Sequence, residues 1–350
     1  MRPAAPIAKA DLDLILEQTR EMWEEVRGQR IFLTGGTGFF GCWLLESFSH
    51  VNRELGLGAR ATVLSRDPAK FAVKCPHLTA DAAVSLHAGD VRDFDFPAGE
   101  FGYVIHAATE TTGEQAPGEL LSTIVAGTEQ TLDFAAQCGA KKFLLTSSGA
   151  VYGRQPAEMT HVPESYLGAP DTMDAASVYA EGKRVSELLC ALHQKAATAR
   201  GKAYEAKIAR CWAFIGPHLP LDAHFAVGNF IGDVLAGRPI AIGGDGTPRR
   251  SYLYAADLAV WLWTMLLRGP ALVPINVGSG NDVSIRELAE TVAQTLRPET
   301  EIRVAKQAVA GAAPARYVPS VERAEALLGL RETVALDEAI QRTAAWHGMH

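Results

Sequence analysis

The segment from residue 30 to residue 48 constrains the fold more than any other part of this sequence. The apolar run RIFLT is followed by the glycine-rich turn GGTGFFG and then by CWLLESF, whose apolar positions have helical spacing. A strand that passes through glycines directly into a helix is typical of the first unit of a parallel α/β sheet. The N–H groups at the start of such a helix can bind a pyrophosphate. We therefore expect a dinucleotide site at Gly35, Gly38 and Gly41.

The pattern of strand followed by helix repeats along the chain. We predict further strands at 61–65, 84–89, 103–108, 142–148 and 206–212, and helices at 119–138 and 177–198. This alternation predicts an α/β fold with a Rossmann-type, doubly wound parallel sheet. It is interrupted near residue 216, returns at 274–280, and gives way to helices at 284–296 and 320–346.

Three regions follow from this pattern. We expect a helical extension over 1–29, with its helix at 11–27, and a Rossmann domain over 30–215 together with about 252–280. A smaller, mixed α/β C-terminal substrate domain is expected from 216–251 and 281–350.

Charge and composition exclude several classes of partner. The 33 basic and 40 acidic side chains give a net charge of −7 without a local basic patch, which argues against nucleic-acid binding. The longest apolar stretch, 260–267, is much shorter than the roughly 20 residues of a membrane span. The N-terminal region is too acidic for a leader peptide, so we expect a cytoplasmic protein without membrane association.

The cysteines contain no CxxC pair and suggest neither a disulfide framework nor a zinc site, so no metal is expected. They are Cys42, Cys75, Cys138, Cys190 and Cys211.

A second chemical signal is the pair Tyr179 and Lys183. The four-residue spacing places the phenol and the ammonium group on one face of the helix predicted at 177–198. A neighbouring cation would lower the pKa of the phenol toward the neutral range. Ser148 ends the strand predicted at 142–148, and carboxyl ends of strands are where functional groups gather in such sheets. We expect these three side chains to form the catalytic site.

The motifs TGGTGFFG (34–41), GD (89–90), HAA (106–108), TSSGAVYG (146–153) and YAEGK (179–183) occur in this order. Together with 209–217, 227–231, 244–258 and 275–280 they resemble the extended short-chain dehydrogenase/reductase family, often called NAD-dependent epimerase/dehydratase. The resemblance runs from about residue 30 to residue 340. It implies an enzyme that uses NAD(P) to modify a nucleotide-linked sugar.

The resemblance also assigns roles to individual residues. It implies that the glycines hold the pyrophosphate, that Asp90 contacts the adenine, and that Lys183 binds the nicotinamide ribose. The cofactor set is Gly35, Thr37, Gly38, Phe39, Phe40, Gly41, Asp90, Val91, Ala107, Ala108, Tyr179 and Lys183. The substrate set is Thr109, Ser148, Tyr179, Asn229 and Arg250, with Asn229 and Arg250 on the diphosphate.

The sequence departs from the family pattern at three places. Dehydratases and decarboxylases of the family place acidic residues where this chain has Gly149 and Ala150, so both activities are disfavoured. Ser65 and Arg66 follow the second strand, where NAD-preferring members carry an acid. They favour NADP, although Asp67 leaves NAD open. Ala213 stands where many relatives have an asparagine.

These departures favour one activity. The expected reaction is reduction of a nucleoside diphosphate (NDP)-linked 4-keto-6-deoxyhexose at carbon 4, a step of polysaccharide biosynthesis. The alternative is a 4-epimerase that uses the same residues, and a cofactor-binding protein without catalysis is the least favoured reading. The resemblance further implies a homodimer formed through the helices at 119–138 and 177–198.

Overall fold

A computed structural model describes residues 3–109, 115–202, 204–223, 225–309 and 311–348 of the chain. Its centre is a sheet of seven strands that all run parallel, in the order β11-β6-β5-β4-β1-β2-β3. The strands are β1 (Arg30–Thr34), β2 (Arg60–Ser65), β3 (Val84–Ala88), β4 (Tyr103–His106), β5 (Lys142–Ser148), β6 (Glu205–Cys211) and β11 (Pro274–Val277). The sheet order reverses between β1 and β4, so the predicted doubly wound Rossmann-type sheet is confirmed.

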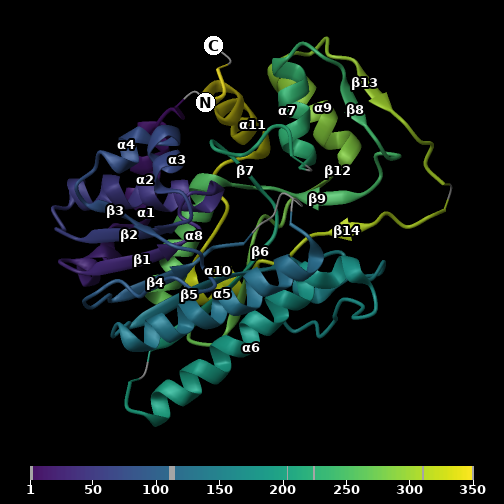
Figure 1. Ribbon diagram of the computed structural model, residues 1–350. Coiled ribbons are helices and arrows are strands. Elements are labelled where there is room, and N and C mark those ends of the chain that lie inside the picture. Colours follow the sequence, from purple (N-terminus) through teal and green to yellow (C-terminus); the bar gives the residue numbers. More distant parts are fainter. Residues whose placement is uncertain (1–2, 110–114, 203, 224, 310, 349–350) are drawn as a thin grey trace.

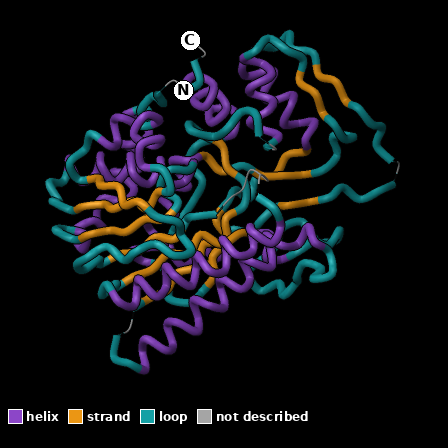
Figure 2. Tube along the Cα trace, viewed as in Figure 1, coloured by secondary structure: helices purple, strands orange, loops and turns teal. Residues whose placement is uncertain are grey.

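The sheet is covered by helices on both faces, and its strands are accordingly apolar on both sides (Figure 2). Ile31 and Leu33 of β1 belong to one buried cluster, and Phe32 between them belongs to the other. The first face carries α1 (Lys9–Thr19), α2 (Phe39–Glu54) and α8 (Ala255–Arg268), and the second carries α5 (Pro117–Gln137) and α6 (Val178–Ala199). Figure 1 shows α5 and α6 crossing the lower side of the sheet together.

Helix α8 explains the longest apolar stretch of the sequence. Residues 255–267 of this helix are all buried, so it is a core helix of the first face. Within the described residues, no helix combines the length and the apolar character that crossing a membrane requires.

The N-terminal region packs into the same core. The predicted helix at 11–27 is an α-helix only as far as Thr19, and a 3₁₀ helix, η1 (Arg20–Val26), continues it. Trp23 is fully buried, with its ring 4.7 Å from that of Trp263 in α8. Asp11 is buried as well. It accepts a hydrogen bond of 2.8 Å from the Tyr254 hydroxyl and pairs with Arg342 of α11 (Leu336–Trp346).

A smaller lobe is built from segments before and after β11 and lies beyond the carboxyl edge of the sheet (upper right in Figure 1). Its elements are α7 (Ala226–Leu235), β8 (Ile240–Ile242), β9 (Arg249–Ser251), β12 (Asp282–Ser284), α9 (Ile285–Leu296), β13 (Ile302–Val304) and β14 (Arg316–Tyr317). Strand β9 pairs with β12 on one side and with β14 on the other. The helix predicted over 320–346 is wrong as a single element: α10 (Glu322–Leu328) ends at Gly329, whose φ of 66° breaks the helix before α11 begins.

Short elements complete the chain. They are α3 (Pro68–Lys74), α4 (Pro76–Thr79), η2 (Gly149–Tyr152), η3 (Ala175–Ser177), β7 (Phe214–Ile215) and β10 (Leu253–Tyr254).

Candidate active site

The glycine-rich turn leaves space for a ligand at one of its three predicted glycines. Gly35 has a φ of 72°, and a Cβ there would overlap the backbone of Ala107. A Cβ on Gly41 would overlap the backbone of Gly36. Gly38 is different, because it is exposed and a Cβ there would find no atom closer than 3.5 Å. Gly35 and Gly41 therefore serve the fold of the turn, whereas Gly38 keeps the approach to the start of α2 open.

The first turn of α2 has the features of an anion site. No side chain caps this helix, so its leading N–H groups are available, and Phe39 and Phe40 flank them half-buried. The carbonyl of Thr37 accepts a hydrogen bond of 3.0 Å from Lys74 Nζ, which ties the turn to the end of α3. Ala108 lies across the turn, with its N–H 3.3 Å from Thr34 Oγ1.

The residues predicted for the adenosine end lie after β2 and β3. Ser65 is buried, and its hydroxyl accepts a hydrogen bond of 3.2 Å from the Asp67 N–H. The Asp67 carboxylate caps α3 by accepting from the Lys70 N–H at 2.9 Å. Arg66 is exposed. The only acid at this turn is therefore already used to begin a helix.

Asp90 is held by a neighbouring arginine. Arg92 donates two hydrogen bonds to the Asp90 carboxylate, at 2.8 and 3.0 Å, and these bonds hold the pKa of the carboxyl below its usual value. Val91 is buried next to it and packs against Gly127, where a Cβ would come within 2.8 Å of Val91 Cγ1.

Ser148, Tyr179 and Lys183 lie together where β5 ends and α6 begins. The hydroxyl groups of Ser148 and Tyr179 are within hydrogen-bonding reach. Lys183 is only 2% exposed, and its ammonium group lies 5.9 Å from the centre of the Tyr179 ring. That ammonium donates to Thr109 Oγ1 at 2.7 Å and to the Thr146 carbonyl at 2.8 Å. Burial lowers the pKa of Lys183 to about 8.

The prediction that Lys183 makes the phenol acidic is wrong for the protein by itself. Burial raises the pKa of Tyr179 to about 12, and the hydrogen bond with Ser148 offsets only part of this effect. Lys183 is not among the causes of this shift: its ammonium group lies 5.9 Å from the centre of the ring and donates to Thr109 Oγ1 and to the Thr146 carbonyl. Tyr179 is therefore a protonated phenol at neutral pH.

Tyr317 is a member of this cluster that the sequence analysis missed. It stands on β14, and its hydroxyl is within hydrogen-bonding reach of Ser148. Its ring centre lies 4.4 Å from that of Trp212, and burial raises the pKa of its phenol. The pairing of β9 with β14 sets Arg250 directly beside Tyr317, with the guanidinium carbon 5.8 Å from the ring centre. No local motif marks Tyr317, because only this long-range pairing brings it to the site.

Gly149 lies against two of these aromatic side chains. A Cβ at this position would be 2.6 Å from the ring of Trp212 and 2.8 Å from the hydroxyl oxygen of Tyr317. Both separations are shorter than real contacts of a Cβ atom. The space beside the backbone of Gly149 is thus occupied, and a longer acidic side chain has no room there.

A buried network fixes the Trp212 ring. Trp212 Nε1 and the Tyr152 hydroxyl donate to Asn276 Oδ1 at 3.1 and 2.9 Å. The amide nitrogen of Asn276 donates in turn to the carbonyls of Val162 and Ser320, at 2.9 and 3.0 Å. Because each of these polar groups has a partner, the wall beside Gly149 is rigid.

Asn229 is the predicted site residue that the structure does not connect with the others. It lies on α7, which packs against α9. In the part of the chain that is described, no hydrogen bond, ion pair or ring contact joins it to Ser148, Tyr179 or Arg250.

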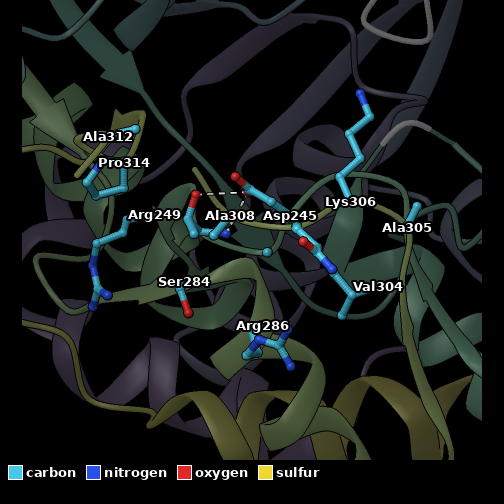
Figure 3. Close-up of a pocket in the computed structure, with 13 residues that line it drawn as sticks. Asp245, Arg249, Ser284, Arg286, Val304, Ala305, Lys306, Ala308, Ala312 and Pro314 are labelled. Atoms are coloured by element: carbon cyan, nitrogen blue, oxygen red, sulfur yellow. Dashed lines mark hydrogen bonds between the residues drawn. The ribbon is translucent and has the colours of Figure 1, made fainter. Parts of the chain in front are cut away.

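A pocket of about 760 Å³ lies elsewhere in the smaller lobe (Figure 3). Arg249, Arg286 and Lys306 line it together with Asp245, and none of the site residues predicted from the sequence does. Arg249 is paired with Asp282 and lies 3.3 Å from Glu287. Neighbouring residues of a strand point to opposite faces, so Arg249 lines this pocket while Arg250 lies beside Tyr317.

Comparison with known proteins identifies the family. The profile of the NAD dependent epimerase/dehydratase family matches residues 31–278. UDP-glucuronic acid decarboxylase 6 of Arabidopsis thaliana is 30% identical over 316 residues, which cover 89% of this chain and 86% of that protein. UDP-glucuronic acid decarboxylase 1 of Xenopus tropicalis is 28% identical over 319 residues, with coverage of 90% and 71%.

Solved structures resemble the fold at lower identity. The UDP-N-acetylglucosamine 4-epimerase of Methanobrevibacter ruminantium M1 superposes with a TM-score of 0.76 at 18% identity, covering 91% of this chain and 98% of its own. The UDP-glucuronic acid 4-epimerase of Bacillus cereus gives 0.74 at 20% identity, with the same coverage. The parallel sheet, the glycine turn and the cluster of Ser148, Tyr179 and Lys183 agree with these relatives. The profile match and the sequence relatives show that this chain is an enzyme of the NAD-dependent epimerase/dehydratase family.

Proposed function

We propose that this enzyme reduces the keto group at carbon 4 of an NDP-linked 4-keto-6-deoxyhexose. The observation that carries the proposal is the cluster of three hydroxyl groups on Ser148, Tyr179 and Tyr317. Burial raises the pKa of both phenols, so at neutral pH the cluster offers protons. A ketone that is being reduced needs a proton donor at its oxygen, which is what this cluster can supply.

The chemistry divides between cofactor and protein. A bound NAD(P)H supplies the hydride that carbon 4 accepts. Tyr179 transfers its phenolic proton to the sugar oxygen, so that the carbonyl becomes an alcohol and Tyr179 is later reprotonated from solvent. Ser148 donates a hydrogen bond to the same oxygen while its negative charge develops. Lys183, held by Thr109 and Thr146, would bind the nicotinamide ribose.

The adenosine end supports a preference for NADP. A 2′-phosphate needs a cation, and exposed Arg66 provides one next to Ser65. A bare ribose diol is usually bound by a carboxylate, but Asp67 already caps α3. The expected readout is a lower KM for NADPH than for NADH, and Arg66→Ala should remove most of that difference.

The substrate is proposed to be a nucleotide-linked sugar that bridges both parts of the protein. The relatives named above act on UDP-glucuronic acid, which is such a sugar. Arg250 makes no ion pair among the described residues, and its guanidinium group can bind the diphosphate from the smaller lobe. Asn229 is assigned to the diphosphate on the resemblance alone.

Decarboxylation and dehydration are disfavoured by the surroundings of Gly149. Both reactions in this family employ an acidic side chain near this position, and here Trp212 and Tyr317 fill the space. A 4-epimerase is the second candidate, because it needs the same hydroxyl groups. It must first oxidise its substrate, with Tyr179 as the base, whereas a reductase uses Tyr179 only as the proton donor.

The deciding experiment supplies NADPH together with a panel of NDP-linked 4-keto-6-deoxyglucoses. We expect one NADPH to be oxidised for each sugar reduced. Tyr179→Phe should lower kcat by about 10²-fold or more. Tyr204→Phe is the matched control, because Tyr204 is a buried tyrosine whose hydroxyl has no hydrogen-bond partner in the described part of the chain.

Two results would contradict the proposal. One is interconversion of 4-epimeric sugars without net NADPH consumption, and the other is release of CO₂ from UDP-glucuronic acid. Cofactor binding without affinity for any nucleotide sugar would instead indicate a protein that lacks catalysis.

A homodimer through α5 and α6 is also proposed. These two helices pack side by side and leave several apolar side chains exposed: Leu121, Val185, Leu188 and Leu192. A second copy could bury them in a four-helix contact. Light scattering of the wild type should give the dimer mass, and Leu188→Asp with Leu192→Asp should give the monomer.

A further inference from the structure

A second cluster of reactive side chains lies beneath the glycine-rich turn, apart from the hydroxyl cluster. Cys42, Cys75 and His218 each place one donor atom within 4.8 Å of the others, and all three residues are buried. They come from the first turn of α2, from the residue that ends α3, and from the loop after β7. The fold thus gathers two thiols and an imidazole from three separate elements.

The imidazole of His218 has a free lone pair inside the protein. Its side chain is 0% exposed, and its Nε2 lies 3.0 Å from Glu46 Oε1. A carboxylate accepts, so Nε2 is the donor of this bond, and in a neutral imidazole Nδ1 is then the nitrogen open to a metal ion. Nδ1 has no hydrogen-bond partner among the described residues. A buried acceptor without a partner is costly, and a bound ion would satisfy it.

Glu46 is itself held in place. It is buried, and its other oxygen accepts a hydrogen bond of 2.6 Å from the Ile7 N–H. A carboxylate that fixes the tautomer and orientation of a histidine is the usual support behind a metal-binding imidazole.

We propose that Cys42, Cys75 and His218 bind a Zn²⁺ ion, with Glu46 orienting the histidine. Two thiolates and one imidazole are preferred zinc ligands, and the two negative charges of the thiolates balance the ion in a buried setting. Binding releases the two thiol protons to solvent. A water molecule completes the tetrahedral set, since this group supplies three protein ligands. The spacing of the cysteines in the sequence did not suggest zinc, because the ligands do not form a local motif.

The ion would stiffen the turn that is proposed to hold the cofactor. The Cys42 N–H donates to the Gly38 carbonyl at 3.0 Å. Lys74, next to Cys75, donates to the Thr37 carbonyl at 3.0 Å. A metal ion bound to both Cys42 and Cys75 would therefore link the two segments whose hydrogen bonds, to Gly38 and to Thr37, hold the turn. Zinc should tighten cofactor binding without contributing to the proton transfer.

The test measures metal directly and does not depend on catalysis. Protein purified under reducing conditions and reconstituted with ZnSO₄ should retain about one zinc per chain after gel filtration, by elemental mass spectrometry. Reconstitution with Co²⁺ should give thiolate-to-cobalt charge-transfer bands. Cys75→Ser and His218→Asn should each lower zinc retention by about 10-fold or more. Cys138→Ser and Cys190→Ser are controls, because these buried cysteines lie outside the cluster and should retain zinc.

The proposal can be refuted with the wild-type protein alone, so the test does not depend on whether the variants fold. Failure to retain zinc after reconstitution, or a cobalt spectrum without thiolate bands, would refute the site. A Cys42–Cys75 disulfide in reduced preparations, detected by peptide mass spectrometry, would also refute it. Each of these outcomes is independent of whether the sugar reduction is found.

Discussion

Replacing Gly149 by alanine tests whether the aromatic side chains of Trp212 and Tyr317 close the space beside this residue. The new methyl group would lie 2.6 Å from the Trp212 ring and 2.8 Å from the Tyr317 hydroxyl. Trp212 cannot easily move, because Asn276 holds its indole N–H at 3.1 Å. Overpacking of this kind costs about 1 to 3 kcal/mol. If Tyr317 moves instead, the hydrogen bond to Ser148 is lost, at a net cost of about 1 kcal/mol. We expect Gly149→Ala to lower the free energy of unfolding by about 2 kcal/mol.

Urea denaturation followed by tryptophan fluorescence measures this change. Gly118→Ala is the control, because Gly118 lies in the first turn of α5 and a Cβ there would meet no atom within 4 Å. That control should be neutral or stabilising by up to about 1 kcal/mol. Combining Gly149→Ala with Tyr317→Ala should recover part of the loss, with a coupling free energy of about 0.5 to 3 kcal/mol.

One result would refute this reasoning. If Gly149→Ala is as stable as the wild type and shows no coupling with Tyr317→Ala, then the space beside Gly149 is open. The structural argument against decarboxylation would then fail.

Three further predictions concern pH, catalysis and stability. Burial lowers the pKa of His106 to about 3 from an unfolded value of 6.5. Between pH 6.5 and about 3, the unfolded chain therefore binds a proton that the folded chain does not. The free energy of unfolding should fall by about 1.4 kcal/mol for each pH unit as the pH drops across this range. His106→Gln should flatten that slope in urea denaturation, and an unchanged slope would contradict the assignment. Tyr317→Phe removes the hydroxyl next to Ser148. It should lower kcat about tenfold with little change in the KM for the cofactor. An unaltered kcat would exclude Tyr317 from the mechanism. Asp11→Ala removes the buried partner of Tyr254 and Arg342 and should cost about 1.5 to 3 kcal/mol. Glu301→Ala, at an exposed pair with Arg303, should change stability little, and equal effects of the two variants would contradict the role given to burial.

The sequence predicted the sheet well because its signals are local. Each strand is a short apolar run bounded by turn residues, and the turn at 35–41 marks the change from strand to helix. Parallel strands linked by helices then leave few possible sheet orders. The sequence also predicted Ser148 beside Tyr179, because Ser148 ends β5 and Tyr179 lies in the first turn of α6, both at the carboxyl edge of the sheet.

What the sequence could not predict depends on long-range contacts. Tyr317 reaches Ser148 only because β14, a strand of two residues, pairs with β9. Strands so short carry no periodic pattern. The pKa of Tyr179 was misjudged because the spacing shows that Lys183 is near but does not show the burial of the phenol, which is the main cause of the shift. The ligands of the proposed zinc site are likewise far apart in the sequence and come together only in the folded chain.

The partnership of Asp11 with Arg342 sets the order in which the protein can be completed during translation. These residues are 331 positions apart, and the Trp346 indole N–H also reaches back to the Ala5 carbonyl at 3.0 Å. Helix α1 is synthesised long before α11, so its acidic anchor has no cationic partner until α11 emerges. The apolar face of α1, including Ile15, can pack against α2 and α8 before then, but the buried charge of Asp11 is paired with Arg342 only once α11 is in place.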